Sequence, residues 1–312
     1  MTRVLITTDY LRPGDEVDEY LRAAGLEPVY SPKTGRRDPE ALVAALAGID
    51  AALVANEPFT AGVLARTPRL RVIVRTGVGY DSIDVEAAAR QGISVSNLPG
   101  VNANAVAEYT MGLLLAGARR LVQSATGVAA GGWPRAEGRE LRGSTLGLIG
   151  YGASARAVVP LARAFGMTVV CTSRLRGPGV RFVELPELLS TSDYVSVHTA
   201  LTERTRGLLD AVAFKQMKPT ALLVNTARGA IVDEDALVAA VRVGEIAGAA
   251  LDVVGEEPLP ADSPLREVAG IVVYSHLAGQ TAEARRAAGL RGAEELVAAL
   301  EGRARHTVNG EG

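Results

Sequence analysis

The chain has 312 residues, about twice the roughly 150 of a typical domain, and 48% apolar with 22% charged residues is ordinary globular composition. Basic and acidic residues nearly cancel, 33 against 35, which leaves a net charge of −2. This composition excludes a disordered or fibrous chain and predicts two globular domains. It also argues against nucleic acid as a ligand, because nucleic-acid binders usually carry a clustered basic excess.

The first third of the chain alternates short β-branched runs with helical patterns, which implies a parallel sheet. The helices end at glycine, as at Gly25 and Gly92. The predicted strands cover residues 4–7, 51–55, 71–76 and 94–96, and the predicted helices cover 16–24 and 85–91. The first strand is not preceded by the basic region and long apolar core of a signal peptide, so we expect a cytoplasmic protein.

A long helical pattern follows over about 102–120, and the glycine-rich stretch 127–133 after it indicates a connection between domains. The apolar part of the helix, 109–118, is shorter than the roughly 20 residues that span a membrane, so we expect no membrane attachment. A second alternation then predicts five or six more parallel strands. The last helix, about 281–300, fits either domain.

The strands of this second alternation cover residues 145–149, 168–171, 194–197, 221–224, 249–253 and 271–274, with helices over 153–165 and 235–243. The single cysteine, Cys171, lies inside an apolar run. That position indicates a small buried side chain rather than a nucleophile or a metal ligand, and we expect no metal site.

A glycine-rich turn joins the strand over 145–149 to the helix that follows, and it reads GYGASA at residues 150–155. Gly150 permits the tight turn, Gly152 allows a diphosphate to approach the backbone, and small Ala155 allows close helix–strand packing. The helix N-terminus supplies amide donors. A plain glycine-rich turn is the alternative, but the position between a strand and a helix favours dinucleotide binding.

The end of the next strand, about 20 residues further on, is where an acidic residue would bind the ribose of NAD. This chain has Ser173 and Arg174 there, with Arg176 close by and no carboxylate. Arginine can pair with the 2′-phosphate of NADP, so we expect NADPH to be preferred, with NADH possible. The alternative is that Arg174 is a solvated loop residue.

Two of the three histidines, His198 and His276, follow strands at the carboxyl ends where open α/β sheets bind ligands. His306 lies in the polar C-terminal tail. Position alone does not choose between the first two. A 2-oxo acid reductase also needs a cation for the substrate carboxylate and an acid for the nascent alkoxide. Arg228 fits the first need, and the pair Glu257 and His276 fits the second, although isolated residues of these types are often structural.

Several fragments together carry a family likeness: TGVGYDSID at 76–84, NANAVAE at 102–108, GYG at 150–152, NTARG at 225–229, ALDV at 250–253, EP at 257–258 and HLAG at 276–279. In these motifs the chain resembles the D-2-hydroxyacid dehydrogenases, and in particular their 3-phosphoglycerate dehydrogenase-like branch. The resemblance implies an α/β protein of two doubly wound parallel-sheet domains. A Rossmann cofactor domain over 99–283 would be inserted in a flavodoxin-like substrate domain formed by 1–98 plus 284–312.

The resemblance also implies residue roles. Arg228 would anchor the substrate, and His276, oriented by Glu257, would be the acid–base group in a cleft that closes to exclude water. The expected substrate contacts are Val78, Gly79, Asn102, Arg228 and His276. The expected cofactor contacts are Gly150, Gly152, Ala153, Ser154, Ser173, Arg174, Thr199, Thr226 and Asp252. A homodimer through the cofactor domain, with the helix from Asn102 at the contact, is expected as well.

Some positions depart from the family pattern. Ser154-Ala155 replaces the usual Ile-Gly, Tyr274-Ser275 replaces Thr-Pro, and Ser173-Arg174 replaces the acidic residue, as in NADP-preferring glyoxylate and hydroxypyruvate reductases. Ala55-Asn56 stands where phosphoglycerate dehydrogenases have an arginine for the substrate phosphate.

We therefore expect an NADPH-preferring reductase that converts a small 2-oxo acid to the D-2-hydroxy acid. Its substrate would be glyoxylate, hydroxypyruvate or an anionic relative such as a phosphonate 2-oxo acid. One alternative is 3-phosphoglycerate dehydrogenase itself. An alternative of another class is a non-catalytic dinucleotide-sensing protein, because transcriptional corepressors share this fold.

Overall fold

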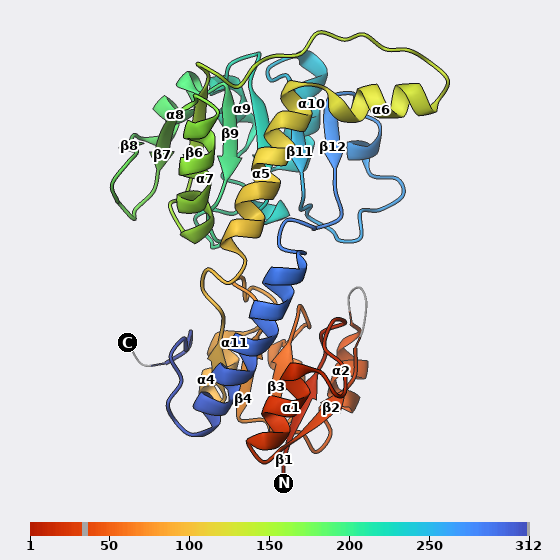
Figure 1. Ribbon diagram of the computed structural model, residues 1–312, viewed down its shortest axis with the longest axis vertical. Coiled ribbons are helices and arrows are strands. Elements are labelled where there is room, and N and C mark those ends of the chain that lie inside the picture. The colour runs from red at the N-terminus through yellow and green to blue at the C-terminus, as the bar shows by residue number, and fades with distance from the viewer. Residues whose placement is uncertain (33–36, 311–312) are drawn as a thin grey trace. The chain divides into compact units, whose positions relative to one another are not determined.

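A computed structural model describes residues 1–32 and 37–310 (Figure 1). The chain forms two compact units. Unit 1 contains Met1–Asn102 together with the C-terminal residues from Thr281 onward, and unit 2 contains Ala103–Gln280. The chain thus leaves unit 1, builds unit 2 and returns to complete unit 1.

Unit 1 is a five-stranded parallel sheet with helices on both faces. Its elements are β1 (Thr2–Ile6), α1 (Glu16–Ala23), β2 (Leu26–Tyr30), α2 (Pro39–Ala45), β3 (Ala51–Val54), α3 (Ala61–Leu64), β4 (Val72–Arg75), α4 (Val85–Arg90), β5 (Ser94–Ser96) and α11 (Ala282–Leu300). The strand order β2-β1-β3-β4-β5 is that of a flavodoxin-like sheet.

Helix α11 belongs to unit 1, which answers the question that its sequence left open. Its Ala288, Ala293 and Leu296 belong to one buried cluster with Leu53 of β3 and Val74 of β4, the two strands on which the helix packs. The opposite face of the sheet is covered by α2, α3 and α4, which bury their apolar side chains there. A last short segment after α11 lies along the outer strand β5, where residues 96 and 307 form an antiparallel bridge.

Unit 2 is a seven-stranded parallel sheet in the order β12-β11-β10-β9-β6-β7-β8, a Rossmann arrangement with one added strand. Its elements are α5 (Ala103–Ala118), α6 (Leu121–Ala129), β6 (Thr145–Ile149), α7 (Ala153–Ala164), β7 (Thr168–Thr172), β8 (Arg181–Phe182), α8 (Leu185–Thr191), β9 (Tyr194–Val197), α9 (Ala211–Gln216), β10 (Leu222–Asn225), the 3₁₀ turn η1 (Gly229–Ile231), α10 (Glu234–Val243), β11 (Gly248–Leu251), the 3₁₀ turn η2 (Pro264–Arg266) and β12 (Ile271–Val273). The predicted class, α/β with two doubly wound parallel sheets, is confirmed.

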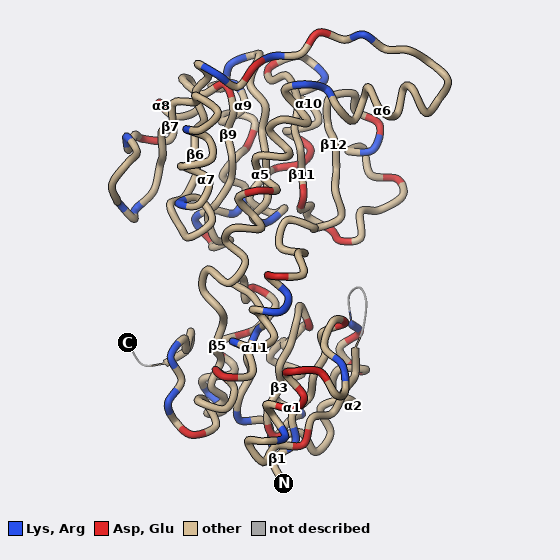
Figure 2. Tube along the Cα trace, viewed as in Figure 1, with Lys and Arg blue, Asp and Glu red and all other residues tan. Residues whose placement is uncertain are grey.

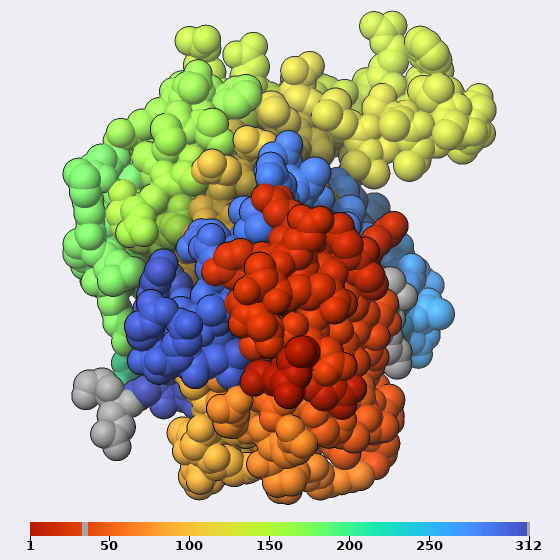
Figure 3. All heavy atoms as spheres, turned by 60° about the horizontal axis from the view of Figure 1, so that its bottom comes forward, coloured from red at the N-terminus to blue at the C-terminus, as the bar shows by residue number. Residues whose placement is uncertain are grey.

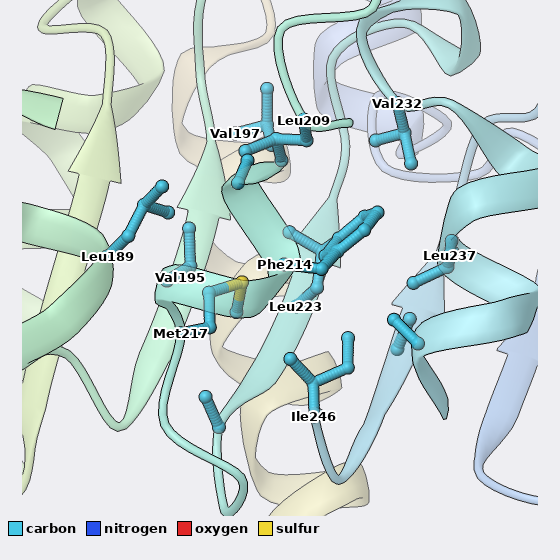
Figure 4. Packing of buried hydrophobic residues seen from close by; sticks show 14 of the residues in the cluster. Leu189, Val195, Val197, Leu209, Phe214, Met217, Leu223, Val232, Leu237 and Ile246 are labelled. Carbon is cyan, nitrogen blue, oxygen red and sulfur yellow. The ribbon is translucent and has the colours of Figure 1, made fainter. Parts of the chain in front are cut away.

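Each face of the unit 2 sheet has its own apolar core. Helices α8, α9 and α10 cover one face, where Phe214 of α9 packs among Leu209, Leu223 and Leu237 (Figure 4). Helices α5 and α7 cover the other face, and α5 packs against β10 and β11. Burial of these apolar side chains stabilises the sheet, and it fixes the strand ends from which the site is built.

One expectation about the chain's organisation was wrong. The glycine-rich stretch 127–133 does not connect the domains, because it lies wholly within unit 2 and its first part ends helix α6. Gly131, with φ of 85°, donates its amide to the Val128 carbonyl and stops the helix, as glycine often does. The glycines here end a helix. Composition alone does not distinguish a glycine-rich helix end from a glycine-rich linker between domains.

Charges of both signs are interspersed along both units (Figure 2). Among the helices of the described residues, none combines the length and the apolar character needed to cross a bilayer.

Candidate active site

The turn between β6 and α7 is shaped by contact with the end of β9. Gly150 has φ of 102°, and a Cβ built on it would lie only 2.5 Å from the carbonyl oxygen of His198. Gly152 is the N-cap of α7, and no side chain caps the helix. The first amides of α7, at Ala153 and Ser154, therefore have no capping acceptor and are suited to an anionic group such as a diphosphate.

His198 is buried under this turn. Its Nδ1 lies 3.1 Å from Ser154 Oγ, and its Nε2 lies 2.9 Å from Ser196 Oγ. Burial lowers the pKa of His198 to about 4. A buried, uncharged ring with both nitrogens engaged is not suited to exchange protons with a substrate, so of the two histidines at strand ends only His276 remains for that role.

The loop after β7 carries the residues expected at the adenosine end of the cofactor. Ser173 Oγ accepts a hydrogen bond from the Leu175 amide at 3.1 Å, which shapes the turn. Arg174 is exposed, and within the described part of the chain its side chain forms no hydrogen bond or ion pair. Arg176 lies over the ring of Phe182, with its guanidinium carbon 4.8 Å from the ring centre.

Arg228 is presented by a turn that the buried side chain of Asn225 organises. Asn225 Oδ1 accepts the Ala227 amide at 3.0 Å, and Asn225 Nδ2 donates to the Arg228 carbonyl at 2.9 Å. The Arg228 guanidinium donates from Nη1 to the Ala227 carbonyl at 2.8 Å. A side chain at the next residue, Gly229, would collide with the backbone of Val254, so the loop after β11 lies directly against this turn.

That loop carries Glu257 to the second predicted catalytic residue. Glu257 Oε2 lies 2.8 Å from His276 Nδ1, and Glu257 Oε1 accepts the Val254 amide at 3.3 Å. Burial raises the pKa of Glu257, but the hydrogen bond and charge of His276, the Val254 amide and the charge of Arg228 together hold it below its usual value. The carboxylate is thus ionised near neutral pH, and it fixes the proton of the imidazole on Nδ1.

The backbone of His276 has φ of 58°, in the left-handed region that β-carbon sterics disfavour. Buried Asp252 holds it there. The His276 amide donates to the Asp252 carbonyl at 2.8 Å, and the Asp252 carboxylate accepts the amides of Leu277 and Ala278 at 2.7 and 2.9 Å. Asp252 was expected among the cofactor contacts, and these bonds were not predictable, because nothing in the motif ALDV indicates which backbone amides the carboxylate meets.

The other expected residues lie as follows. Thr226 follows β10, with its hydroxyl oxygen 3.4 Å from that of Thr110 on α5. Thr199 directly follows His198 at the end of β9, and its amide nitrogen would be 2.9 Å from a Cβ on Gly150. All of these belong to unit 2.

Val78, Gly79 and Asn102 belong to unit 1. The Val78 carbonyl accepts a hydrogen bond from Asn97 Nδ2 at 2.7 Å, which steadies the loop after β4, and the Val78 side chain is exposed.

A pair of aromatic rings lies beside Asp252 and was not foreseen. Tyr109 of α5 and Tyr274 meet edge to face, with ring centres 6.0 Å apart. Burial raises the pKa of Tyr109 above its ordinary value, and the charge of Asp252 adds to the effect. A signal existed in the sequence, since Tyr274 departs from the threonine common in the family, but its partner on α5 was not predictable from spacing.

Unit 2 therefore brings together an arginine and a carboxylate–imidazole pair at the carboxyl ends of β10, β11 and β12, and an uncapped helix N-terminus after β6. An arginine can bind a carboxylate and polarise a carbonyl, and the imidazole can deliver a proton. Over the described ranges, 1–32 and 37–310, no group of three or more His, Cys, Asp or Glu side chains could hold a metal ion.

Comparison with known proteins agrees with this geometry. A family model described as D-isomer specific 2-hydroxyacid dehydrogenase, NAD binding domain, matches residues 111–278. A glyoxylate reductase of Aeropyrum pernix is 44% identical over 255 residues, covering 77% of this chain and 76% of the relative. A D-3-phosphoglycerate dehydrogenase of Mycobacterium leprae is 39% identical over 274 residues, covering 85% of this chain and 52% of the relative. The solved structure of an acyclic imino acid reductase with NADPH and D-Arg is 27% identical, with a TM-score of 0.89 over 98% of this chain and 100% of that chain.

Proposed function

The chain belongs to the D-isomer specific 2-hydroxyacid dehydrogenase family, and we propose that it reduces glyoxylate, hydroxypyruvate or a closely related small 2-oxo acid with NADPH. The observation that carries the proposal is the pair Glu257–His276, 2.8 Å apart, in which Glu257 lies on the loop that packs against the turn of Arg228. Unit 2 would bind the dinucleotide, and unit 1 would contribute the substrate contacts Val78, Gly79 and Asn102.

Three residues have defined roles in this reaction. Arg228 pairs with the substrate carboxylate and polarises the 2-oxo group, which favours negative charge on its oxygen. The reduced nicotinamide supplies the hydride. His276 gives the proton on its Nε2 to the alkoxide that forms at C2, while its Nδ1 stays bonded to Glu257. Glu257 stabilises the charged imidazole that precedes this transfer and keeps the ring in its orientation.

NADPH preference is proposed from the loop after β7. The strand ends at Thr172, and the next residues, Ser173 and Arg174, offer a hydroxyl and a cation where a ribose-binding carboxylate would otherwise stand. Arg174 is exposed, and Arg176 is held on the ring of Phe182 nearby. Both arginines suit the 2′-phosphate, and the similar imino acid reductase binds NADPH.

The substrate is proposed to be small and to lack a phosphate. Relatives named glyoxylate reductase support this, and Ala55-Asn56 in unit 1 offers no cation where phosphoglycerate dehydrogenases have an arginine. Phosphoglycerate dehydrogenase activity remains the alternative, favoured by the 39% identity to the Mycobacterium leprae enzyme. A phosphonate 2-oxo acid is a further candidate within the same reaction.

A homodimer through unit 2 is proposed. The helix from Asn102, α5, was expected at the contact, but it packs against α7 and the sheet, so the contact is proposed through α6, which follows it, and the segment after α6. Helix α6 buries none of its residues in unit 2, and Leu121, Val128 and Trp133 are exposed, Trp133 to 80%. This part of the chain stands out from the surface (Figure 3). Exposed apolar side chains gathered on one segment are typical of a protein interface. Light scattering on the purified chain tests the proposal, and a monomer at micromolar concentration would refute it.

The proposed reaction is tested by following the absorbance of the reduced nicotinamide. NADPH and NADH are each supplied with glyoxylate, hydroxypyruvate, 3-phosphohydroxypyruvate and phosphonopyruvate. Turnover of glyoxylate or hydroxypyruvate, faster with NADPH, is expected. Turnover of 3-phosphohydroxypyruvate alone would favour phosphoglycerate dehydrogenase, and tight NADPH binding without turnover of any acid would favour the dinucleotide-sensing alternative.

A further inference from the structure

His198 lies beneath the phosphate-binding turn, and neither the proton transfer nor the substrate contacts use it. Its backbone and its ring both meet that turn. The His198 amide donates to the Ile149 carbonyl at 2.8 Å, and its carbonyl oxygen is the atom that leaves room only for glycine at position 150. The end of β6 and the glycine that opens the turn are therefore both in direct contact with His198.

The ring of His198 joins two serines that lie on different elements. Ser196 is on β9, within the sheet, and Ser154 is in the first turn of α7. The distances, 2.9 Å from Nε2 to Ser196 Oγ and 3.1 Å from Nδ1 to Ser154 Oγ, are those of ordinary hydrogen bonds. The ring thus ties the start of α7 to the sheet.

The ring is uncharged near neutral pH, since burial lowers its pKa to about 4. A neutral imidazole has one donor and one acceptor nitrogen, so one serine hydroxyl accepts a hydrogen bond from the ring N–H and the other donates a hydrogen bond to the bare ring nitrogen. Both bonds are satisfied without placing a charge below the helix N-terminus, where a positive charge would face the positive end of the helix dipole.

Ser154 bonds inward through its side chain, while its amide and that of Ala153 belong to the helix end that no side chain caps. If the first turn of α7 tilted, the N–H groups of both residues would point in another direction. Hydrogen bonds to a diphosphate depend on that aim, because they weaken steeply away from linearity.

We propose that His198 is a positioning residue for the dinucleotide diphosphate, acting through Ser154 to fix the first turn of α7. The inference rests on the proposed function, since it assumes a dinucleotide at this turn. It assigns a task to the serine that replaces the family's isoleucine in the glycine-rich motif.

Binding of NADPH and NADH to the full chain, measured by calorimetry, tests this. S154A removes the hydroxyl and leaves the His198 ring in place. Kd should rise about fivefold, the factor for the roughly 1 kcal/mol of one hydrogen bond, and by the same factor for both dinucleotides, which share the diphosphate. S154T, which keeps the hydroxyl, should restore affinity. S190A, at an exposed serine of α8, is the matched control.

A second measurement starts from the native chain and then compares it with S154A. The sequence has three histidines, so nitrogen NMR of the imidazoles resolves each of them. His198 should keep the signature of a neutral ring through the neutral range, and S154A should change its tautomer populations. A His198 that charges near neutral pH, or that is unaffected by S154A, would overturn the proposal.

The outcomes separate this inference from the proposed function. Wild-type affinity in S154A overturns the role of His198 alone, and so does a loss confined to NADPH. Loss of affinity for both dinucleotides in S154A, in a chain that turns over none of the acids, overturns the proposed reaction alone. If the native chain binds neither dinucleotide, both are overturned.

Discussion

Gly150 and Gly152, two residues apart, should lose different properties when each is changed to alanine: Gly150 the stability of the fold, and Gly152 the affinity for NADPH. A Cβ on Gly150 would lie 2.5 Å from the His198 carbonyl oxygen and 2.9 Å from the Thr199 amide nitrogen, at φ of 102°. These are backbone atoms of a central strand end and cannot turn aside. A Cβ on Gly152, at φ of −73°, would meet nothing nearer than 4.0 Å.

The magnitude follows from these geometries. In G150A, a non-glycine residue at positive φ costs about 1–2 kcal/mol and overpacking about 1–3 kcal/mol, so the free energy of unfolding should fall by roughly 2–5 kcal/mol. For a unit of this size that lowers Tm by roughly 5–15 °C. In G152A, alanine at an N-cap costs no more than about 1 kcal/mol. Its added carbon would instead obstruct the approach of a diphosphate, so the Kd for NADPH should rise at least about tenfold, or roughly 1.4 kcal/mol.

The assay combines urea unfolding, followed by far-UV circular dichroism, with calorimetric titration of NADPH. Fluorescence of the single tryptophan is a poor probe because Trp133 is 80% exposed in the native protein. Equal loss of stability in G150A and G152A would refute the reasoning about backbone contact. Wild-type NADPH affinity in G152A would refute the placement of the diphosphate at this turn.

Other variants test the remaining roles. Arg228→Ala should raise KM for the 2-oxo acid and lower kcat together, because the carboxylate anchor and the polarising charge are lost at once; an unchanged KM would contradict this. His276→Ala should mainly lower kcat, by about 10²–10⁴-fold, and full turnover would remove it as the proton donor. Arg174→Ala should weaken binding of NADPH far more than of NADH in a titration, whereas equal effects would exclude the 2′-phosphate contact. Burial raises the pKa of Cys171 to about 12, so a thiol reagent at about pH 8 should label it only after unfolding, and rapid labelling of the native chain would contradict its burial.

The sequence predicted the two parallel sheets because buried parallel strands are apolar runs bounded by glycine and polar turns. It missed β2 and β8. Strand β2 contains Pro28, which is tolerated because β2 lies at the edge of its sheet, and β8 is only two residues long. The residue pattern alone did not decide where α11 packs, because a helix with small residues on all sides fits more than one core, whereas the family resemblance assigned residues 284–312 to the substrate domain.

The site was predictable where chemistry depends on residue type and strand position, as for Arg228, Glu257 and His276. The spacing of residues along the sequence did not indicate which of the two histidines at strand ends is the proton donor. His198 and His276 differ in burial and in their partners, a glutamate in one case and two serines in the other. Those partners come from distant parts of the chain, so only the folded structure distinguishes them.

The return of α11 to unit 1 has a consequence for synthesis on the ribosome. The apolar residues of β3 and β4 leave the ribosome early, yet the helix that packs on them begins at Ala282, so they wait until unit 2 has been made. At roughly 5–20 residues per second this leaves that face of the two strands without α11 for about 10–50 seconds. Unit 2 is continuous in sequence and is complete before α11 emerges. The middle of the chain can therefore fold first, and one face of β3 and β4 stays uncovered until α11 packs on it.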